Sequence, residues 1–506
     1  MNSQGIRPDL RWLAACLGIG AALRLFRLGH QSLWTDELIS IGLATYTGGA
    51  EFWRGLLRDV HGPFNSALLH VWYPLGGSES WWRLLYAIPS IFVIPLFYRL
   101  GADLYGERAG RAACVAAALS PFLVWYSQEI RSYAWCILWI TAALVVFVRI
   151  WDDRAAPRSW WLLAILVALG VLTNYATVFL LAALTLAVLL RRPFAPGLAI
   201  RWAGVLGFTA LVFAPWFVDW FQRMSAERLF LGGGPPLGVP LREASGFSLV
   251  GIPFALWTFV FGYTLGPSLH DLHLDRSLRV LLPHTAVLAA GAVVVAWGGW
   301  FGAADAIRRR RAALVAILVL VPLAFATLLA VREIKTFHPR YLVAAFPVVL
   351  TLLAAGWSRT GALSLGIRAL AAGLFVLSLG NHFFSPAYGK EASREVAEFV
   401  RTHEGSSDAV VVIYSGEPFR HYYDTRFHGS APVYTAHKRT LRTDDEMREY
   451  VARASEGRDR VWLVLSRWWE VAPEDRIRGI FEEEFDETGR WEFPGIKLTR
   501  YEERAT

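Results

Sequence analysis

Long apolar blocks separated by short polar segments run through the chain as far as Leu379. Most blocks approach the roughly 20 residues that a helix needs to cross the hydrocarbon core of a bilayer. The pattern therefore predicts a polytopic α-helical membrane protein with about 11–13 transmembrane helices. The expected spans are 10–28, 81–100, 109–126, 131–150, 159–175, 176–190, 202–221, 281–301, 312–331, 341–357 and 362–380.

Two further apolar stretches do not read as simple spans. Residues 63–75 form too short a block and include Asn65 and His70, while residues 247–266 include Pro253 and three glycines. We interpret both as interfacial or re-entrant pieces on the outer face. Irregular backbone at membrane depth needs cover from protein or from a wet cavity, so both pieces are expected to help wall a site there.

The last part of the chain is polar and lacks a block that could span. We therefore expect a membrane domain over 1–384, with a first outer loop over 29–80, and an extracytoplasmic α/β domain over 385–506. The apolar spacing predicts helices over 390–403 and 446–454 and buried strands over 408–414 and 460–465. This domain contains no nucleophile triad, P-loop or Rossmann fingerprint.

The net charge of +8 comes mostly from arginine, and charged residues make up only 18% of the chain. Nucleic-acid binding is not expected, because no basic stripe with interleaved aromatic residues lies outside the loops. Arginine clusters on alternate loops predict cytoplasmic segments, which puts the N-terminus inside. Arg24 and Arg27, at the outer end of the first span, do not fit this orientation. The clusters are Arg99/Arg108/Arg111, Arg149/Arg154/Arg158, Arg191/Arg192/Arg201 and Arg308-Arg309-Arg310-Arg311.

Two adjacent carboxylates, Asp36 and Glu37, follow the first apolar block. As a catalytic residue, one of them would act as a general base, which contributes about 10²–10⁴-fold in typical enzymes. As a structural residue, Asp36 would cap an interfacial helix over 38–44, with Glu37 favourable to the helix dipole. Both interpretations stay open on the pair alone.

The segment 126–133 joins two expected spans without a real loop, so Glu129 and Arg131 lie at membrane depth. Ionisable groups there usually pair or bind a ligand. The planar fork of arginine matches two phosphate oxygens, and Arg131 with Tyr133 beside it is a candidate for a lipid phosphate. The structural alternative is a Glu129–Arg131 pair that caps two helix ends.

The segment 332–341 places several potential cations on the outer face, against the usual bias of positive charge toward the cytoplasm. Lys335 and Arg340 are candidates for binding a donor phosphate, with Tyr341 as a supporting residue. Snorkelling of long side chains at span ends is the alternative. His61, at the start of the 63–75 piece, is a further supporting candidate.

His270 and His273 stand at i and i+3, a spacing that can bind a metal on a helix. Without a clear third ligand the signal is weak. No cofactor is certain from the sequence, and a divalent metal is left open.

The chain resembles the GT-C membrane glycosyltransferases, in particular the family-39 group of protein O-mannosyltransferases and aminoarabinose transferases. The resemblance is densest over residues 30–135, and position 62 departs from it, since Gly62 stands where a second proline is usual. The motifs that carry it are Trp34-Thr35-Asp36-Glu37, His61-Gly62-Pro63-Phe64, Glu79 with Arg83-Leu84, Tyr98-Arg99-Leu100-Gly101, Leu119-Ser120-Pro121, Tyr126-Ser127-Gln128-Glu129-Ile130-Arg131-Ser132-Tyr133 and Arg340-Tyr341.

The resemblance implies an inverting transfer of a single sugar, mannose or similar, from a polyprenyl-phosphate donor to a lipid, glycan or protein acceptor on the outer face. It implies that Asp36 is the catalytic base and that Arg131 lies by the donor phosphate. A transporter or flippase of lipid-linked substrates is the main alternative, and a non-catalytic scaffold is a third. Arginine far outnumbers lysine, which fits a GC-rich bacterium and hence a multi-pass protein of the bacterial plasma membrane.

Overall fold

The chain folds as two compact units in the computed structural model. The first comprises Met1–Leu28, Ser40–Leu265 and Ala286–Leu379, and the second comprises Gly29–Ile39, Gly266–Thr285 and Gly380–Thr506. The second unit thus takes in two segments that the hydropathy pattern assigned to the membrane domain. The structure describes residues 10–46, 48–58, 62–191, 193, 195–223, 248–275, 277–332, 334, 336–414, 416–436, 443–468 and 474–504.

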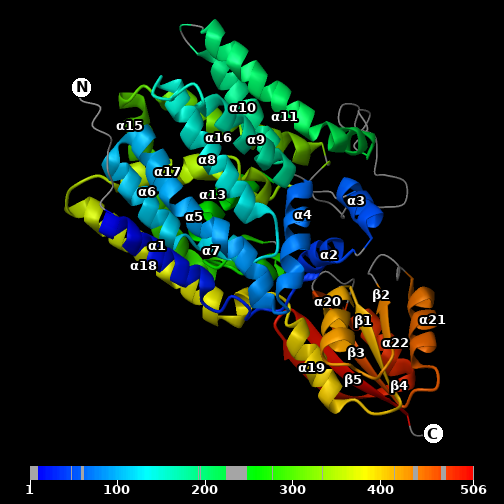
Figure 1. The fold of residues 1–506 in the computed structure, drawn as a ribbon. Helices are drawn as coiled ribbons and strands as arrows, with labels where there is room; N and C mark the ends of the chain where they lie inside the picture. The colour runs from blue at the N-terminus through cyan, green and yellow to red at the C-terminus, as the bar shows by residue number, and fades with distance from the viewer. Residues whose placement is uncertain are drawn as a thin grey trace. The chain divides into compact units, whose positions relative to one another are not determined.

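The first unit is helical (Figure 1), and α2, α15 and α18 also contribute residues to the second unit. Its helices are α1 (Leu10–Leu25), α2 (Thr35–Ala44), α3 (Gly49–Arg58), α4 (Pro63–Trp72), η1 (Tyr73–Leu75), α5 (Glu79–Tyr105), α6 (Glu107–Leu119), α7 (Pro121–Ser127), α8 (Tyr133–Trp151), α9 (Ser159–Thr173), α10 (Thr177–Leu190), α11 (Pro196–Arg223), α13 (Gly251–Phe261), α15 (Thr285–Arg308), α16 (Ala312–Val331), η3 (Pro339–Leu342), α17 (Phe346–Trp357) and α18 (Ala362–Phe384).

Six helices in the described part of the chain are long and apolar enough to cross a membrane, or seven if the bent pair α6 and α7 is one span. The expected polytopic helical fold is confirmed, but four of the eleven expected spans form shorter helices. These four, α1, α9, α10 and α17, have 16, 15, 14 and 12 residues. Asn174 has an extended backbone between α9 and α10 and accepts a hydrogen bond from the Ala176 amide, which fixes the break.

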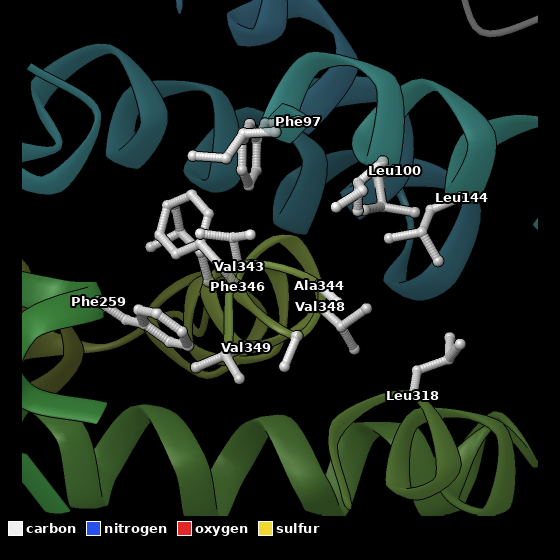
Figure 2. Packing of buried hydrophobic residues seen from close by; sticks show 14 of the residues in the cluster. Phe97, Leu100, Leu144, Phe259, Leu318, Val343, Ala344, Phe346, Val348 and Val349 are labelled. Carbon is white, nitrogen blue, oxygen red and sulfur yellow. The ribbon is translucent and has the colours of Figure 1, made fainter. Parts of the chain in front are cut away.

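The core of the first unit lies around α17, in which nearly every side chain is buried. Figure 2 shows Phe346, Val348 and Val349 of this helix among Phe97 of α5 and Phe259 of α13. A helix that is apolar all round is stable only when neighbours cover every face. The sequence of α17 therefore predicts a central position, and the structure gives it one.

Arginines from three expected cytoplasmic clusters meet at one end of the first unit. The Asp103 carboxylate of α5 lies 3.2 Å from Arg99, 3.1 Å from Arg149 and 3.4 Å from Arg154. Asp152 pairs with Arg311 at 2.6 Å. These loops share one end of the helix bundle, as the orientation argument requires, and the side of the membrane that this end faces stays a prediction.

Arg24, which departed from the charge pattern, is fully buried in α1. Its guanidinium donates to the carbonyls of Ala117 and Ala118 at 2.9 and 3.0 Å and to the Ser90 hydroxyl at 2.8 Å. The two carbonyls belong to the last turn of α6, whose final carbonyls have no partner within the helix. Arg24 therefore stabilises the break between α6 and α7 and is not a topology signal.

The second unit contains the expected α/β fold. Its five-stranded sheet has the order β2-β1-β3-β5-β4, with β1 parallel to β2 and β3 and with β5 antiparallel to β3 and β4. The strands are β1 (Asp408–Ile413), β2 (Val433–Ala436), β3 (Arg460–Ser466), β4 (Phe485–Phe493) and β5 (Ile496–Glu503), and the helices are α14 (Leu269–Leu274), η2 (Leu278–His284), η4 (Pro386–Tyr388), α19 (Ser393–His403), α20 (Gly416–Arg420), η5 (His421–Arg426), α21 (Asp444–Ser455) and α22 (Glu474–Glu484).

The two faces of this sheet are covered by different helices (Figure 1). Val411 and Leu463 share a core with side chains of α21 and α22. On the other face, Phe399 of α19 lies edge-on to Trp462 with 6.3 Å between ring centroids. Neighbouring residues of a buried strand point to opposite faces, which is why β1 and β3 are apolar at almost every position.

We predict that Asp103→Asn lowers the free energy of unfolding by about 1–3 kcal/mol, since hydrogen bonds to charged groups contribute about 1.5–3 kcal/mol each. The measurement is thermal unfolding of the purified protein in detergent. Asp153→Asn is the matched control, because its carboxylate is 83% exposed and pairs only with Arg191 among the contacts resolved here. Equal losses of unfolding free energy in the two variants would contradict the interpretation that Asp103 holds three arginines together.

Candidate functional site

The segment Gly29–Ile39, called here the first-loop segment, carries both candidate carboxylates in the first turn of α2. Glu37 is fully buried, and its carboxylate accepts a hydrogen bond from Lys390 Nζ at 3.1 Å. It also accepts one from the backbone amide of Trp34, the residue before the helix, at 3.4 Å. Asp36 is half-buried in the same turn. The alternative in which Asp36 is the N-cap of a helix over 38–44 is wrong, because α2 begins at Thr35 and Asp36 lies inside its first turn.

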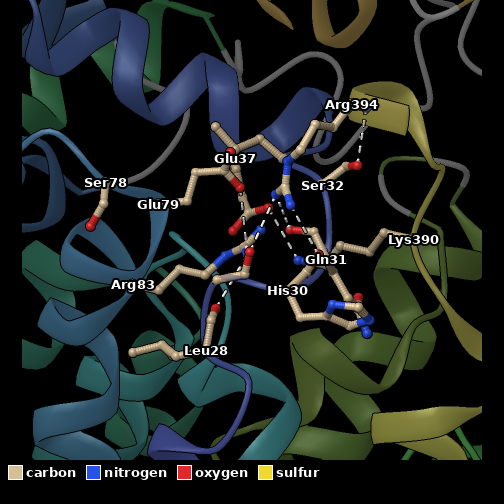
Figure 3. A network of polar contacts seen from close by, with 12 residues as sticks. Leu28, His30, Gln31, Ser32, Glu37, Ser78, Glu79, Arg83, Lys390 and Arg394 are labelled. Carbon is tan, nitrogen blue, oxygen red and sulfur yellow. Dashed lines mark hydrogen bonds and ion pairs between the residues drawn. The ribbon is translucent and has the colours of Figure 1, made fainter. Parts of the chain in front are cut away.

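The residues before α2 have no regular structure, and side chains of the second unit bind their polar groups one after another (Figure 3). The Arg394 guanidinium donates to the carbonyls of Gly29, His30 and Gln31 at 3.3, 3.2 and 3.2 Å. Such contacts matter because buried backbone groups outside helices and sheets still need partners.

Two more contacts continue this series. The Ser32 hydroxyl donates to Glu395 at 2.9 Å and accepts from the Arg394 amide at 3.2 Å. The Leu33 amide donates to the Tyr422 hydroxyl at 2.7 Å. Every residue from 29 to 33 is thus bound by a side chain or amide from the region 394–422.

The break between α7 and α8 carries the phosphate candidate of the first unit. Glu129, Arg131 and Tyr133 are all buried there. Arg131 Nη1 donates to the hydroxyl of Ser40 in α2 at 3.1 Å. A guanidinium buried at such a break suits an anionic partner, and the membrane depth of Glu129 and Arg131 stays a prediction.

A cluster of aromatic hydroxyls lies beside this break. The Tyr126 and Tyr263 hydroxyls are 2.8 Å apart, and the rings of Tyr126 and Tyr133 are 4.8 Å apart. Arg340, which is half-buried, lies over the Tyr341 ring at 5.2 Å. Tyr263 was not among the sequence candidates, although it belongs to the 247–266 piece that was expected to wall a site.

A buried ion pair begins α5. Arg83 lies 4.0 Å from Glu79 and donates to the Leu28 carbonyl at 3.3 Å (Figure 3). Ser78 caps the same helix by accepting from the Trp81 amide. Arg83, one of the residues that carried the family resemblance, thus binds the backbone shortly after the end of α1.

Gly62, where the chain departs from the family pattern, lies against the end of α9. A Cβ atom on Gly62 would lie 2.0 Å from the Leu172 carbonyl oxygen, which leaves no space for a side chain. The preceding candidate, His61, and the cation candidate Lys335 lie outside the described residues. Their roles stay predictions.

The two metal-ligand candidates, His270 and His273, lie on either side of a helix-capping residue. Asp271, between the two histidines, closes a capping box with Ser268 at the start of α14. His270 lies edge-on to Trp468 with 5.1 Å between ring centroids, and burial lowers its pKa below the usual value. His273 is exposed. Within the described ranges, no group of three or more His, Cys, Asp and Glu side chains could hold a metal ion.

Comparison with known proteins relates this architecture to membrane enzymes. Residues 60–220 match the family model described as dolichyl-phosphate-mannose-protein mannosyltransferase. The fold is similar to crystal structures of ArnT from Cupriavidus metallidurans. The apo form matches with TM-score 0.58 at 12% identity over 98% of each chain, and the form bound to undecaprenyl phosphate with TM-score 0.57 at 13% identity over 97% of this chain and 98% of that one.

A third similar structure is the oligosaccharyltransferase of Archaeoglobus fulgidus tethered with an acceptor peptide. It matches with TM-score 0.51 at 12% identity over 98% of this chain and 74% of that one. No curated protein sequence matches. The chain has the fold of a GT-C glycosyltransferase. The resemblance expected from its motifs is confirmed by the family match and by the fold.

The family match covers residues 60–220 and leaves the rest of the chain outside. It includes Gly62, the Glu79–Arg83 pair and the segment with Glu129 and Arg131. It does not reach Asp36 or Arg340. The roles of these two residues therefore depend on their surroundings in this structure.

We predict that Gly62→Ala lowers the free energy of unfolding by about 1–3 kcal/mol, the usual cost of forcing extra atoms into a filled space. Thermal unfolding in detergent measures the change. Gly77→Ala is the control, since a Cβ atom on Gly77 would have nothing within 4 Å. A stable Gly62→Ala variant would show that α9 does not restrict this position.

Proposed function

We propose that this GT-C enzyme transfers one sugar, mannose or a similar sugar, from a polyprenyl phosphate to an acceptor hydroxyl on the outer face of a bacterial plasma membrane. The buried Arg131 in the family-matched segment is the observation that carries the proposal. Arg131 also donates to the hydroxyl of Ser40 in the same unit. A phosphate leaving group on a lipid needs a cation at headgroup depth, and Arg131 supplies one.

The ligands and substrates of similar proteins support this donor class. The family model names dolichyl-phosphate-mannose, and one of the ArnT structures contains undecaprenyl phosphate. Both are polyprenyl phosphates. Neither the family match nor the fold supports the alternative of a transporter, and the acceptor class remains lipid, glycan or protein.

The reaction is a single displacement. The acceptor oxygen attacks the anomeric carbon, the bond from that carbon to the phosphate oxygen breaks, and polyprenyl phosphate leaves with the electron pair. The acceptor proton passes to a carboxylate. Attack on the face opposite the leaving group inverts the anomeric centre.

We assign the proton to Asp36 and not to Glu37. Glu37 is fully buried and accepts hydrogen bonds from Lys390 and from the Trp34 amide, while Asp36 is half-buried. A base must reach the acceptor hydroxyl within hydrogen-bond distance, and a carboxylate with exposed surface meets that need better. Arg131 and Arg340 are assigned to the donor phosphate, with Glu129, Tyr133 and Tyr341 as supporting residues.

The direct test is turnover of a radiolabelled polyprenyl-phosphate sugar by the purified enzyme. We predict that Asp36→Asn lowers the transfer rate by about 10²–10⁴-fold, the usual contribution of a general base, while donor binding changes little. Asp486→Asn, a 64%-exposed carboxylate in an ion pair of the same unit, is the control and should keep full activity. Parallel loss of donor binding and turnover in Asp36→Asn would assign Asp36 a structural role.

We predict that Arg131→Ala raises the apparent dissociation constant of the donor by about 10–100-fold, as expected for loss of a charge-assisted hydrogen bond. Equilibrium binding of the labelled donor measures it. Arg158→Ala, an exposed arginine in the loop before α9, should bind the donor normally. An unchanged dissociation constant for Arg131→Ala would remove this residue from the phosphate site.

A further inference from the structure

The first-loop segment lies more than 350 residues before the side chains that bind it. Lys390 and Glu37 are 353 residues apart in the chain, and Leu33 and Tyr422 are 389 apart. Four side chains of the region 390–422 make these contacts, and we call them the clasp: Lys390, Arg394, Glu395 and Tyr422.

The clasp fixes the segment at two levels. Arg394, Glu395 and Tyr422 bind the backbone and the serine hydroxyl of residues 29–33. Lys390 binds the side chain of Glu37, the residue directly after Asp36, and its ammonium also lies 5.7 Å from the centre of the Trp34 ring. The position and the helical start of the Asp36 turn are therefore both set from the C-terminal part of the chain.

The burial of the ion pair makes this arrangement specific. The side chains of Glu37 and Lys390 are 0% and 8% exposed. A buried carboxylate that loses a charged partner becomes strongly unfavourable, so the Lys390 ammonium contributes directly to holding Glu37 at this position. An ion pair on the surface could form with the loop in many positions. A buried ion pair restricts the loop to the position in which both charges are paired.

We propose that the clasp is a positioning device for the catalytic base, with Lys390 and Arg394 as positioning residues that act through the first-loop segment. This inference rests on the assignment of Asp36 in the proposed function. It gives the C-terminal α/β part a role in transfer: it holds the base in place without contacting the reacting atoms.

The test uses the full-length enzyme and two readouts. Lys390→Met should lower kcat by about 10–100-fold, because misplacing a reactive group by about 1 Å can cost about 10²-fold. The KM for the donor should change by less than about threefold, because the phosphate ligands are untouched. Lys390→Arg keeps the positive charge and should recover most of kcat.

The second readout is hydrogen exchange of the backbone amides of residues 29–39. Exchange should rise in Lys390→Met and in Arg394→Met, and most clearly at the Leu33 amide. Asp36→Asn should lower transfer by about 10²–10⁴-fold without changing exchange in this segment, which separates loss of the base from loss of its support.

Arg460→Met is the matched control for general damage to the second unit. Arg460 makes a two-point contact with the buried Asp408 at the start of β1, at 2.8 and 3.1 Å, and none of its contacts described here involves the first-loop segment. This variant should lower the thermal midpoint but leave both kcat and exchange of residues 29–39 near those of the parent.

Two results would overturn the proposal. One is a Lys390→Met enzyme with kcat within about twofold of the parent and unchanged exchange. The other is an Arg460→Met enzyme that, at equal loss of thermal stability, shows the same fall in kcat and the same rise in exchange. If the parent enzyme transfers no sugar from any polyprenyl phosphate, the proposed function fails, while the exchange measurements still decide whether the clasp holds the segment.

Discussion

A buried ion pair between Glu37 and Lys390 is the interaction on which the candidate site depends. Removing two charges from water costs several kcal/mol per ion, and their attraction offsets this only in good geometry. The 3.1 Å contact between Nζ and Oε2 meets that condition. Because neither charge is favourable without the other, the pair acts less as a source of stability than as a constraint on where the Asp36 turn can lie.

The buried charges of the first unit are also held by specific partners. Asp103 collects three arginines at one end, Arg24 binds the terminal carbonyls of α6, and Arg131 donates to a serine hydroxyl. Each charge has a partner at a point where a helix breaks or ends. In an apolar bundle, such contacts decide which breaks are possible, and the break between α7 and α8 holds Arg131, which we assign to the donor phosphate.

Local patterns predicted much of the fold. Apolar blocks located α5, α8 and α16, short or interrupted blocks located α4 and α13, and runs of buried residues located β1 and β3. The patterns failed where the deciding interaction is not local. Hydropathy cannot show that Asn174 separates two helices of 15 and 14 residues. Strands β4 and β5 alternate polar and apolar positions only weakly. Their assignment depends on the pairing of β5 with β3 and of β4 with β5.

The candidate site was predictable in its residue types but not in its division of roles. The acidic pair, Arg131 and Arg340 stood out because charges beside apolar blocks are rare. No sequence spacing could show that Lys390 binds Glu37 across 353 residues, or that Tyr263 lies against Tyr126. The family resemblance already implied Asp36 as the base, and the contact with Lys390 adds a structural reason to assign Glu37 a supporting role.

A double-mutant cycle on the transfer rate tests this account most directly. It compares kcat for Glu37→Gln, Lys390→Gln and the double variant with kcat for the parent enzyme. If Glu37 acts only through its contact with Lys390, the double variant should lose no more activity than the worse single variant. Losses that multiply would mean that the two residues act independently, and they would contradict the assignment of Glu37 and Lys390 as one support for the Asp36 base.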